Sequence, residues 1–365
     1  MREKKNTHQL FDEYEIRTRA SLLWLKKSID VCDGKGSSAF YSRVKLPLKG
    51  WQLPYPETTG YIIETLFQYA DHHGDQSLND YAFRCADWLM GLQLESGAFP
   101  GGYRDYTQPS VFNTGQIVIG MLKAYEKNQN PDYYKTFQKA TQWLVDVLEP
   151  DGSWLQAGYV PGYIPSYNTR VVWPVLWANT LLRSEKTELK MHQALHYYSK
   201  KITPVYSVKD WAAFPGKKAS THFIAYNIRG FLESGVILKE AHWVEIAEQI
   251  LNKIVLLYKN NGRLAGSYDL HWNGNYSYTC VTGNCQIAIN LCRMYALTNK
   301  EAFYETAVAI FSDILPSHRL SSNASLHGAV PGSIPLWGEY LPFRYPNHAV
   351  KFFLDAYYLL KTVKA

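Results

Sequence analysis

Residues 113–126 read NTGQIVIGMLKAYE, a polar opening followed by a helical run of about three turns that is apolar nearly all round. Residues 57–70, ETTGYIIETLFQYA, have the same form. A helix that is apolar on every side is typical of a protein interior. The pattern recurs at intervals of 54 to 63 residues, and the six copies open at Glu57, Asn113, Asn168, His222, Asn284 and Asn347.

Six amphipathic stretches alternate with these apolar segments, and the Lys, Glu and Gln on one side of each are typical of surface helices. They lie near residues 10–30, 79–94, 132–148, 187–200, 240–258 and 301–315. No segment shows sustained alternation with a period of two, so no sheet is predicted. We therefore predict an all-α fold, an (α/α)6 toroid or six-hairpin barrel of alternating outer and inner helices, as a single domain over residues 1–365.

The connections differ between the two ends of the predicted hairpins. After an inner segment the connection is short, as at 127–131, whereas before one it is long and rich in Gly, Pro and aromatic residues, as at 97–112, 152–167 and 327–346. Long ordered loops on one face of a rigid scaffold commonly carry binding groups. The inner helices begin on that same face, and their partial positive charges favour an anionic ligand group such as carboxylate or phosphate.

Composition narrows the classes of function. Of 365 residues, 46% are hydrophobic and 19% charged, which is typical of a globular protein. The net charge of +6 includes no Lys/Arg run beyond the cluster at residues 2–5, so nucleic-acid binding has little support. No apolar run reaches the roughly 18 residues of a membrane span, and the N-terminus lacks the apolar region of a secretory signal. We expect a cytoplasmic protein without a membrane span, for which peripheral association with a membrane stays open.

Neither a metal nor another cofactor is expected. The five cysteines are odd in number and scattered, which suggests reduced thiols. The spacing of Cys280 and Cys285 matches no zinc signature. His271 and His327 belong to no H-x-x-x-H or HExxH pair.

Two resemblances to known families follow from short motifs. Residues 88–99, with Trp88, Gln93, Gly97 and Phe99 at the spacing WLx3Qx3GxF, resemble the repeat motif of terpene-cyclase and prenyltransferase toroids. Residues 143–154 repeat the motif with Leu in place of Gln, and residues 258–264 hold a faded copy. In that superfamily the motif ties outer helix to loop, so the resemblance implies a fold rather than a chemistry.

The second resemblance covers most of the chain. The motifs PETTGYII (56–63), FNTGQIVIGML (112–122), YNTRVVW (167–173), THFIAYNIRGFLE (221–233) and TGNCQIAI (282–289) together resemble bacterial toroid proteins linked to exopolysaccharide and O-antigen biosynthesis. This resemblance implies a role in surface-polysaccharide biosynthesis, without naming a reaction.

The candidate site consists of the residues at the openings of the inner helices. Glu57 and His222 are the best candidates for proton transfer, because burial and neighbouring charges can bring either group towards a neutral pKa. His222, Tyr226 and Arg229 are spaced i, i+4 and i+7, so they share one face of a helix. Simple N-caps, or an internal hydrogen-bond network, are the alternatives. The predicted catalytic residues are Glu57, His222 and Tyr226, and the predicted substrate-binding residues are Asn113, Gln116, Asn168, Arg170, Arg229, Asn284, Trp51 and Trp337.

The long loops add further candidates, whose placement the pattern does not predict. Asp105, Asp269 and Glu339 are candidates for a second carboxylate, as an acid and base pair for glycoside hydrolysis would need. Six loop aromatics are candidates for stacking on sugar rings, with packing among the loops as the equal alternative: Trp51, Tyr103, Trp154, Tyr163, Trp272 and Trp337.

Three functions stay open at this point. The first is a carbohydrate-active enzyme of surface-polysaccharide assembly, acting as a hydrolase, lyase or epimerase on an anionic oligosaccharide or polysaccharide. A Tyr–His–Arg set suits uronate chemistry, in which Arg neutralises the carboxylate and His or Tyr moves the C5 proton. The second is an enzyme like a terpene cyclase or prenyltransferase, although no D-x-D-D motif is present. The third is a non-catalytic glycan-binding protein.

Overall fold

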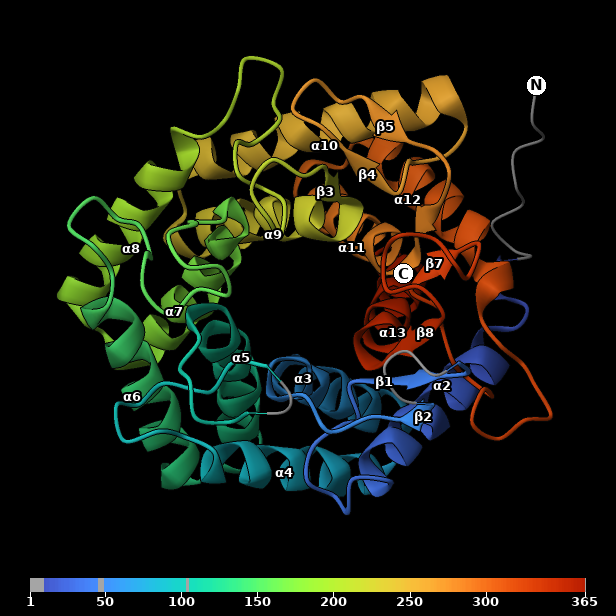
Figure 1. Ribbon diagram of the computed structural model, residues 1–365, viewed down its shortest axis with the longest axis horizontal. Helices are drawn as coiled ribbons and strands as arrows, with labels where there is room; N and C mark the ends of the chain where they lie inside the picture. The colour runs from blue at the N-terminus through green and yellow to red at the C-terminus, as the bar shows by residue number, and fades with distance from the viewer. Residues whose placement is uncertain (1–9, 45–48, 103–104, 365) are drawn as a thin grey trace.

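The computed structural model describes residues 10–44, 49–102 and 105–364. In these ranges twelve α-helices form six hairpins arranged as a closed ring, with one helix of each hairpin inside and the other outside (Figure 1). The predicted (α/α)6 toroid is therefore confirmed. The inner helices are α3 (Pro56–His73), α5 (Val111–Asn128), α7 (Thr169–Leu182), α9 (Thr221–Leu238), α11 (Val281–Thr298) and α13 (Asn347–Thr362).

The outer helices follow the amphipathic stretches of the sequence. They are α2 (Tyr14–Asp30), α4 (Gln76–Gly91), α6 (Pro131–Asp146), α8 (Glu185–Ser199), α10 (Ala241–Asn261) and α12 (Glu301–Ile314). Two residues join each of the first five inner helices to the next outer helix, as between His73 and Gln76. The long loops therefore all lie at the end of the ring where the inner helices begin. No helix among the described residues is long and apolar enough to cross a membrane.

The prediction that the chain has no sheet is wrong in detail. Short strands join the long loops into three small antiparallel sheets, in the orders β2-β1-β8, β3-β4-β5 and β6-β7. Two or three residues are too few to show alternation in the sequence, because a period of two needs several repeats to be recognised. The strands are β1 (Phe40–Ser42), β2 (Gly50–Trp51), β3 (Ala219–Ser220), β4 (Ser267–Tyr268), β5 (Gly274–Asn275), β6 (Thr279–Cys280), β7 (Ser333–Ile334) and β8 (Arg344–Pro346).

Gln93 and Gly97 of the repeat motif tie neighbouring hairpins together at the outer wall. Gln93 Nε2 donates to the carbonyl oxygens of Gly97, at 2.9 Å, and of Thr136 in outer helix α6, at 2.8 Å. A Cβ on Gly97 would lie 2.6 Å from the carbonyl oxygen of Lys139 in the same helix. The motif thus fixes a loop against the next outer helix, which agrees with its role in the fold rather than in chemistry.

Glycines bring neighbouring inner helices into backbone contact. A Cβ on Gly60 of α3 would lie 2.7 Å from Cα of Ile117 in α5. A Cβ on Gly230 of α9 would lie 2.5 Å from the carbonyl oxygen of Thr169, at the start of α7. A Cβ on Gly283 of α11 would lie 2.5 Å from the backbone nitrogen of His222, at the start of α9. These close approaches hold the beginnings of the inner helices at fixed separations.

The ring closes where the last inner helix meets the first. Helix α13 packs against α3, α11 and the outer helix α2. Asn347, the first residue of α13, donates through Nδ2 to Ser37 Oγ at 3.0 Å and to Thr58 Oγ1 at 2.9 Å. The buried side-chain amide of Asn347 therefore connects the last inner helix with the first inner helix and the loop before it.

Replacing Gly283 by Ala should destabilise the protein. The added methyl group meets backbone atoms of Thr221 and His222, which cannot rotate away. We expect a loss of about 1–3 kcal/mol in the free energy of unfolding, measured by denaturant titration. Gly91→Ala is the matched control, since Gly91 is also helical and has no other atom within 4 Å of its Cβ position. Equal stability of Gly283→Ala and wild type would contradict the close packing.

Candidate active site

Capping does not explain the polar residues that open the inner helices. Ser110 caps α5 by accepting a hydrogen bond from the backbone nitrogen of Asn113, and Cys280 caps α11 by accepting one from Gly283. Asn168 occupies the cap position of α7 but makes no side-chain capping hydrogen bond. Asn113 and Asn284 lie one turn further into their helices and are buried. The alternative that these asparagines are simple N-caps is therefore wrong.

Glu57 lies at the start of α3 in a cluster of phenols. Its Oε2 accepts a hydrogen bond from Tyr55 at 2.6 Å and a longer one from Tyr159 at 3.5 Å. Tyr159 also bonds to Oδ1 of Asn113. Burial raises the pKa of Glu57 to about 7, and the hydrogen bonds and the charge of Arg170 oppose that rise only in part. Glu57 can therefore hold or release a proton near neutral pH.

His222 lies at the start of α9, across from a second histidine. Its Nδ1 bonds to Oε1 of Gln286 at 2.8 Å, and because that oxygen only accepts, Nδ1 carries the proton. The ring of His348, at the start of α13, has its centroid 5.7 Å away. Burial lowers the pKa of His222 well below its ordinary value and that of His348 to about 3. Both imidazoles are therefore neutral at pH 7, and Nε2 of His222 has the lone pair of a base.

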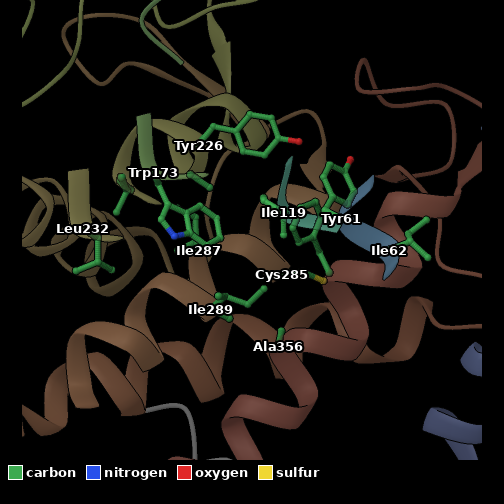
Figure 2. Close-up of a cluster of buried hydrophobic side chains, with 14 of the residues drawn as sticks. Tyr61, Ile62, Ile119, Trp173, Tyr226, Leu232, Cys285, Ile287, Ile289 and Ala356 are labelled. Carbon is green, nitrogen blue, oxygen red and sulfur yellow. The ribbon is translucent and has the colours of Figure 1, made fainter. Parts of the chain in front are cut away.

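Tyr226, one turn after His222 in α9, contacts the imidazole of His222. Its ring centroid lies 4.3 Å from that of His222. Figure 2 shows its hydroxyl group directed towards Tyr61 of α3, at the upper edge of a buried apolar cluster. Neither hydroxyl has a hydrogen-bond partner of good geometry, although both are buried. Burial raises the pKa of each phenol, so both are neutral donors at pH 7.

Arg170 is the cation of this cluster that no carboxylate neutralises. Its Nε donates to Oε1 of Gln116 at 2.8 Å, and its guanidinium lies 4.6 Å from the ring centroid of Tyr226. No ion pair involves Arg170 within the described ranges, although only 4% of the residue is exposed. Its charge lowers the pKa of both Glu57 and His222, and Tyr226 contacts both its guanidinium and the His222 ring. A buried, unpaired guanidinium is suited to bind a carboxylate or phosphate.

Arg229 has a different environment from the one its helical spacing suggested. It shares the lumen-facing side of α9 with His222 and Tyr226, but its Nε lies 2.9 Å from Oε1 of Glu233. Arg293 pairs with the same carboxylate at 2.8 Å. Part of the predicted set therefore forms an internal ionic network, as the alternative interpretation proposed. Substrate binding by Arg229 stays a prediction that competes with this ion pair.

Several buried polar atoms around Arg170 and His222 lack hydrogen-bond partners. They are Nε2 of Gln116, Nε2 of Gln286 and Nδ1 of His348. A small cavity of about 140 Å3 adjoins Arg170 and Gln286. Because an unsatisfied buried polar group costs about 1–3 kcal/mol, such a group usually has a ligand or an ordered water in the working protein. Glu64, Asp355, Lys351, Arg229 and Arg293 also line this cavity, so it holds charges of both signs. The other three cations form ion pairs, and Arg170 is the one cation of the lining for which no ion pair occurs among the described residues.

Four of the sequence candidates lie apart from this cluster. Trp51 packs against Trp24 of α2, with ring centroids 4.8 Å apart, and Trp337 is 68% exposed. The small sheet β2-β1-β8 holds Trp51 in this packing, and sugar stacking on its partly exposed ring stays a prediction. Asp105 accepts hydrogen bonds from Thr107, and Asp269 accepts them from His271 and Asn273, so each carboxylate stabilises its own turn.

Most of the other loop candidates also have structural contacts within the loops. Trp154 and Trp272 are buried and donate to the carbonyl oxygens of Leu144 and Val205. Tyr163 donates to the carbonyl oxygens of Asp210 and Ala212. These three side chains hold loops together. Tyr103 lies outside the described residues, as does the cluster at residues 2–5. Of the candidate loop carboxylates, Glu339 lines a cavity at the mouth of the ring.

Sequence reasoning missed His348, Tyr340, Tyr55 and Tyr159. Tyr340 bonds through its hydroxyl to Nε2 of His348 at 3.0 Å, and its ring centroid lies 5.2 Å from that of His222. A signal for His348 was present, because it is the second residue of α13, as His222 is of α9. The three tyrosines come from loops, for which helical periodicity makes no prediction.

The chain resembles solved structures of carbohydrate enzymes in its fold. An unsaturated glucuronyl hydrolase specific for heparin superposes with a TM-score of 0.77 at 16% identity, over 97% of this chain and 98% of that one. An unsaturated glucuronyl hydrolase from Bacillus sp. GL1 gives 0.74 at 12% identity, over 95% and 96%. A D-mannose isomerase gives 0.70 at 13% identity, over 99% of both chains. No protein-family model matches the chain, and neither does any curated protein sequence.

The stability of Glu57→Gln should differ from that of the wild type in a pH-dependent way. The folded protein binds the Glu57 proton at a pKa of about 7, against an ordinary value of 4.5. In the wild type, stability from this group is present below pH 4.5 and is lost as pH rises through 7. Relative to wild type, Glu57→Gln should therefore gain up to about 3 kcal/mol between pH 5 and pH 8.

Denaturant unfolding at several pH values measures this difference. Glu185→Gln, at an exposed position of outer helix α8, is the control for loss of one surface charge. Parallel stability curves for wild type and Glu57→Gln would contradict the elevated pKa.

Proposed function

We propose that this protein is a carbohydrate-active enzyme that removes the C5 proton of a uronic acid residue within the ring. One observation carries the proposal: the unpaired Arg170 shares a buried cluster with the neutral imidazole of His222 and the carboxyl group of Glu57. Such chemistry needs a cation for the carboxylate, a base for the proton and an acid near its pKa at neutral pH. The fold resemblance to glucuronyl hydrolases and a D-mannose isomerase supports a sugar substrate.

Each group has a defined task in this proposal. Arg170 pairs with the uronate carboxylate and thereby makes the neighbouring C5–H more acidic. His222 takes the C5 proton on Nε2, and the electron pair of the broken C–H bond moves into the carboxylate. Gln286 holds the other ring nitrogen of His222 and so orients the base. Tyr226, which contacts both His222 and Arg170, donates its hydroxyl to the substrate.

The two possible products differ in the atom to which Glu57 transfers its proton. In an elimination, the electron pair expels the oxygen at C4, which takes the proton of Glu57, and an unsaturated sugar is left. In an epimerisation, Glu57 returns a proton to C5 from the opposite face. Both outcomes use the same base and the same acid, and both are consistent with a carboxyl group that is partly protonated at pH 7.

Glycoside hydrolysis by a carboxylate pair has weaker support. It uses two carboxyl groups about 5–9.5 Å apart across the scissile bond. Of the candidate partners for Glu57, Asp105 and Asp269 stabilise their own turns, and Glu339 is held by Asn275 at 2.9 Å in the outer cavity. An acid with an imidazole base describes the cluster better than a pair of acids.

The substrate class and the pathway are also part of the proposal. A uronate within an oligosaccharide or polysaccharide carries the kind of anionic group that Arg170 is suited to bind. The motifs between residues 56 and 289 resemble those of toroid proteins of bacterial exopolysaccharide and O-antigen biosynthesis, so we place the substrate in surface-polysaccharide assembly.

Exchange of the C5 proton tests the proposal. We would incubate the protein with oligosaccharides of glucuronic, galacturonic and mannuronic acid in deuterated water and follow them by NMR. Epimerisation replaces H5 by deuterium, and elimination creates a vinylic H4 signal. His222→Gln should slow either reaction by about 10²–10⁴-fold. His271→Gln, at an exposed loop position, is the control and should keep the full rate.

Other results would contradict this function. Equal rates for wild type and His222→Gln would remove His222 from the reaction. Tight binding of acidic glycans with no exchange and no product would identify a glycan-binding protein. Binding of prenyl diphosphates alone would favour an enzyme like a terpene cyclase or prenyltransferase.

A further inference from the structure

A second and larger cavity lies at the mouth of the ring, among the long loops. Its volume is about 590 Å3, within the range of about 300–1,000 Å3 that is usual for ligand sites. One wall is the sheet β3-β4-β5, in which Ala219 pairs with Tyr268 and Ser267 with Asn275. We propose that this cavity is a subsite for the next residue of an acidic oligosaccharide whose reacting uronate lies in the ring. The proposal rests on the function proposed above.

The cavity adjoins the candidate active site. Tyr340 and Phe223 line it, and both also contact His222, with ring centroids 5.2 and 5.1 Å from the imidazole. Tyr340 also bonds to His348. Ser220, two residues before His222, borders the cavity with a buried hydroxyl that has no partner. A sugar residue in this cavity would therefore be separated from His222 by the side chains of Tyr340 and Phe223.

The lining suits a sugar ring. Phe214 is 60% exposed at the cavity, and Tyr276 presents a partly exposed ring from the loop after β5. Exposed aromatic side chains offer flat apolar faces, while tyrosine also offers a polar edge. The lining also holds amide and hydroxyl groups of Asn275, Ser267 and Tyr278. Aromatic faces beside hydrogen-bonding groups fit the two sides of a pyranose.

The charges favour an anionic sugar. Lys217 and Lys218 stand side by side at the cavity, and both are exposed. Lys218 donates to the carbonyl oxygen of Asn273 at 3.0 Å, and its charge lowers the pKa of Asp269, which lies outside the lining. Glu339 is the one carboxylate of the lining, and Asn275 holds it. Two ammonium groups against one carboxylate make the cavity attractive to a carboxylate or sulfate group on the incoming residue.

The length of the oligosaccharide ligand is the variable that tests this subsite. Isothermal titration calorimetry would compare the wild type with acidic oligosaccharides of one, two and four residues at low and high salt. We expect the tetrasaccharide to bind at least tenfold more tightly than the single residue, with a gain that shrinks at high salt. The double variant Lys217→Gln/Lys218→Gln should lose about tenfold for the longer chains and keep the affinity for the single residue. Phe214→Ala should also weaken only the longer chains.

The control variant is Lys200→Gln/Lys209→Gln, which removes two exposed charges outside the cavity lining and should change nothing. Equal affinity of the wild type for one and four residues would overturn the subsite, as would a full chain-length gain in the Lys217→Gln/Lys218→Gln variant. Either result leaves the proposed reaction intact if the single uronate still binds. Failure of every acidic sugar to bind would overturn the proposed function and the subsite together.

Discussion

Backbone contact between neighbouring inner helices is the constraint on which the rest of the structure depends. At Gly60, Gly230 and Gly283 there is no room for a side chain, since a Cβ would lie within 2.7 Å of the backbone of the next helix. The last two of these contacts involve the first residues of α7 and α9, which carry Arg170 and His222. Their spacing is therefore set by main-chain packing, which does not adjust as a long side chain does. The outer helices and the Gln93 motif support the same ring from outside.

This packing has an electrostatic consequence. Residues that open the inner helices are enclosed by protein, so burial disfavours the charged form of each titratable group. Burial raises the pKa of Glu57 to about 7 and lowers the pKa of His222 well below its ordinary value. One cluster therefore holds both a carboxyl group that can act as an acid and a neutral imidazole that can act as a base. Among the described residues Arg170 forms no ion pair, and nearby amide and hydroxyl groups lack hydrogen-bond partners. A site with these properties costs stability and is suited to a polar anion.

The sequence predicts the ring well because periodicity and loop length act on whole segments. The twelve helices fall where apolar and amphipathic stretches alternate, and Glu57, His222, Tyr226 and Arg170 gather because repeats place equivalent positions at one end. Tyr340 and Tyr159 were missed because loops have no period. Trp51 packs on Trp24 because a two-residue strand holds it there, which periodicity does not predict. Arg229 lies on the predicted face of α9, but its helical spacing to His222 and Tyr226 does not show the ion pair with Glu233 one turn later. His348 was within reach, since it repeats the helix position of His222.

The central claim is that Arg170 binds the carboxylate of a sugar inside the ring. The most direct measurement compares the thermal shift given by an acidic oligosaccharide with that given by its carboxyl-reduced, neutral counterpart. At 100 times its dissociation constant, a ligand stabilises the folded protein by about 2.7 kcal/mol. The account predicts this shift for the acidic form only, its loss in Arg170→Gln, and its retention in Arg19→Gln on the exposed face of α2. Equal shifts for both sugars, or an undiminished shift in Arg170→Gln, would contradict it.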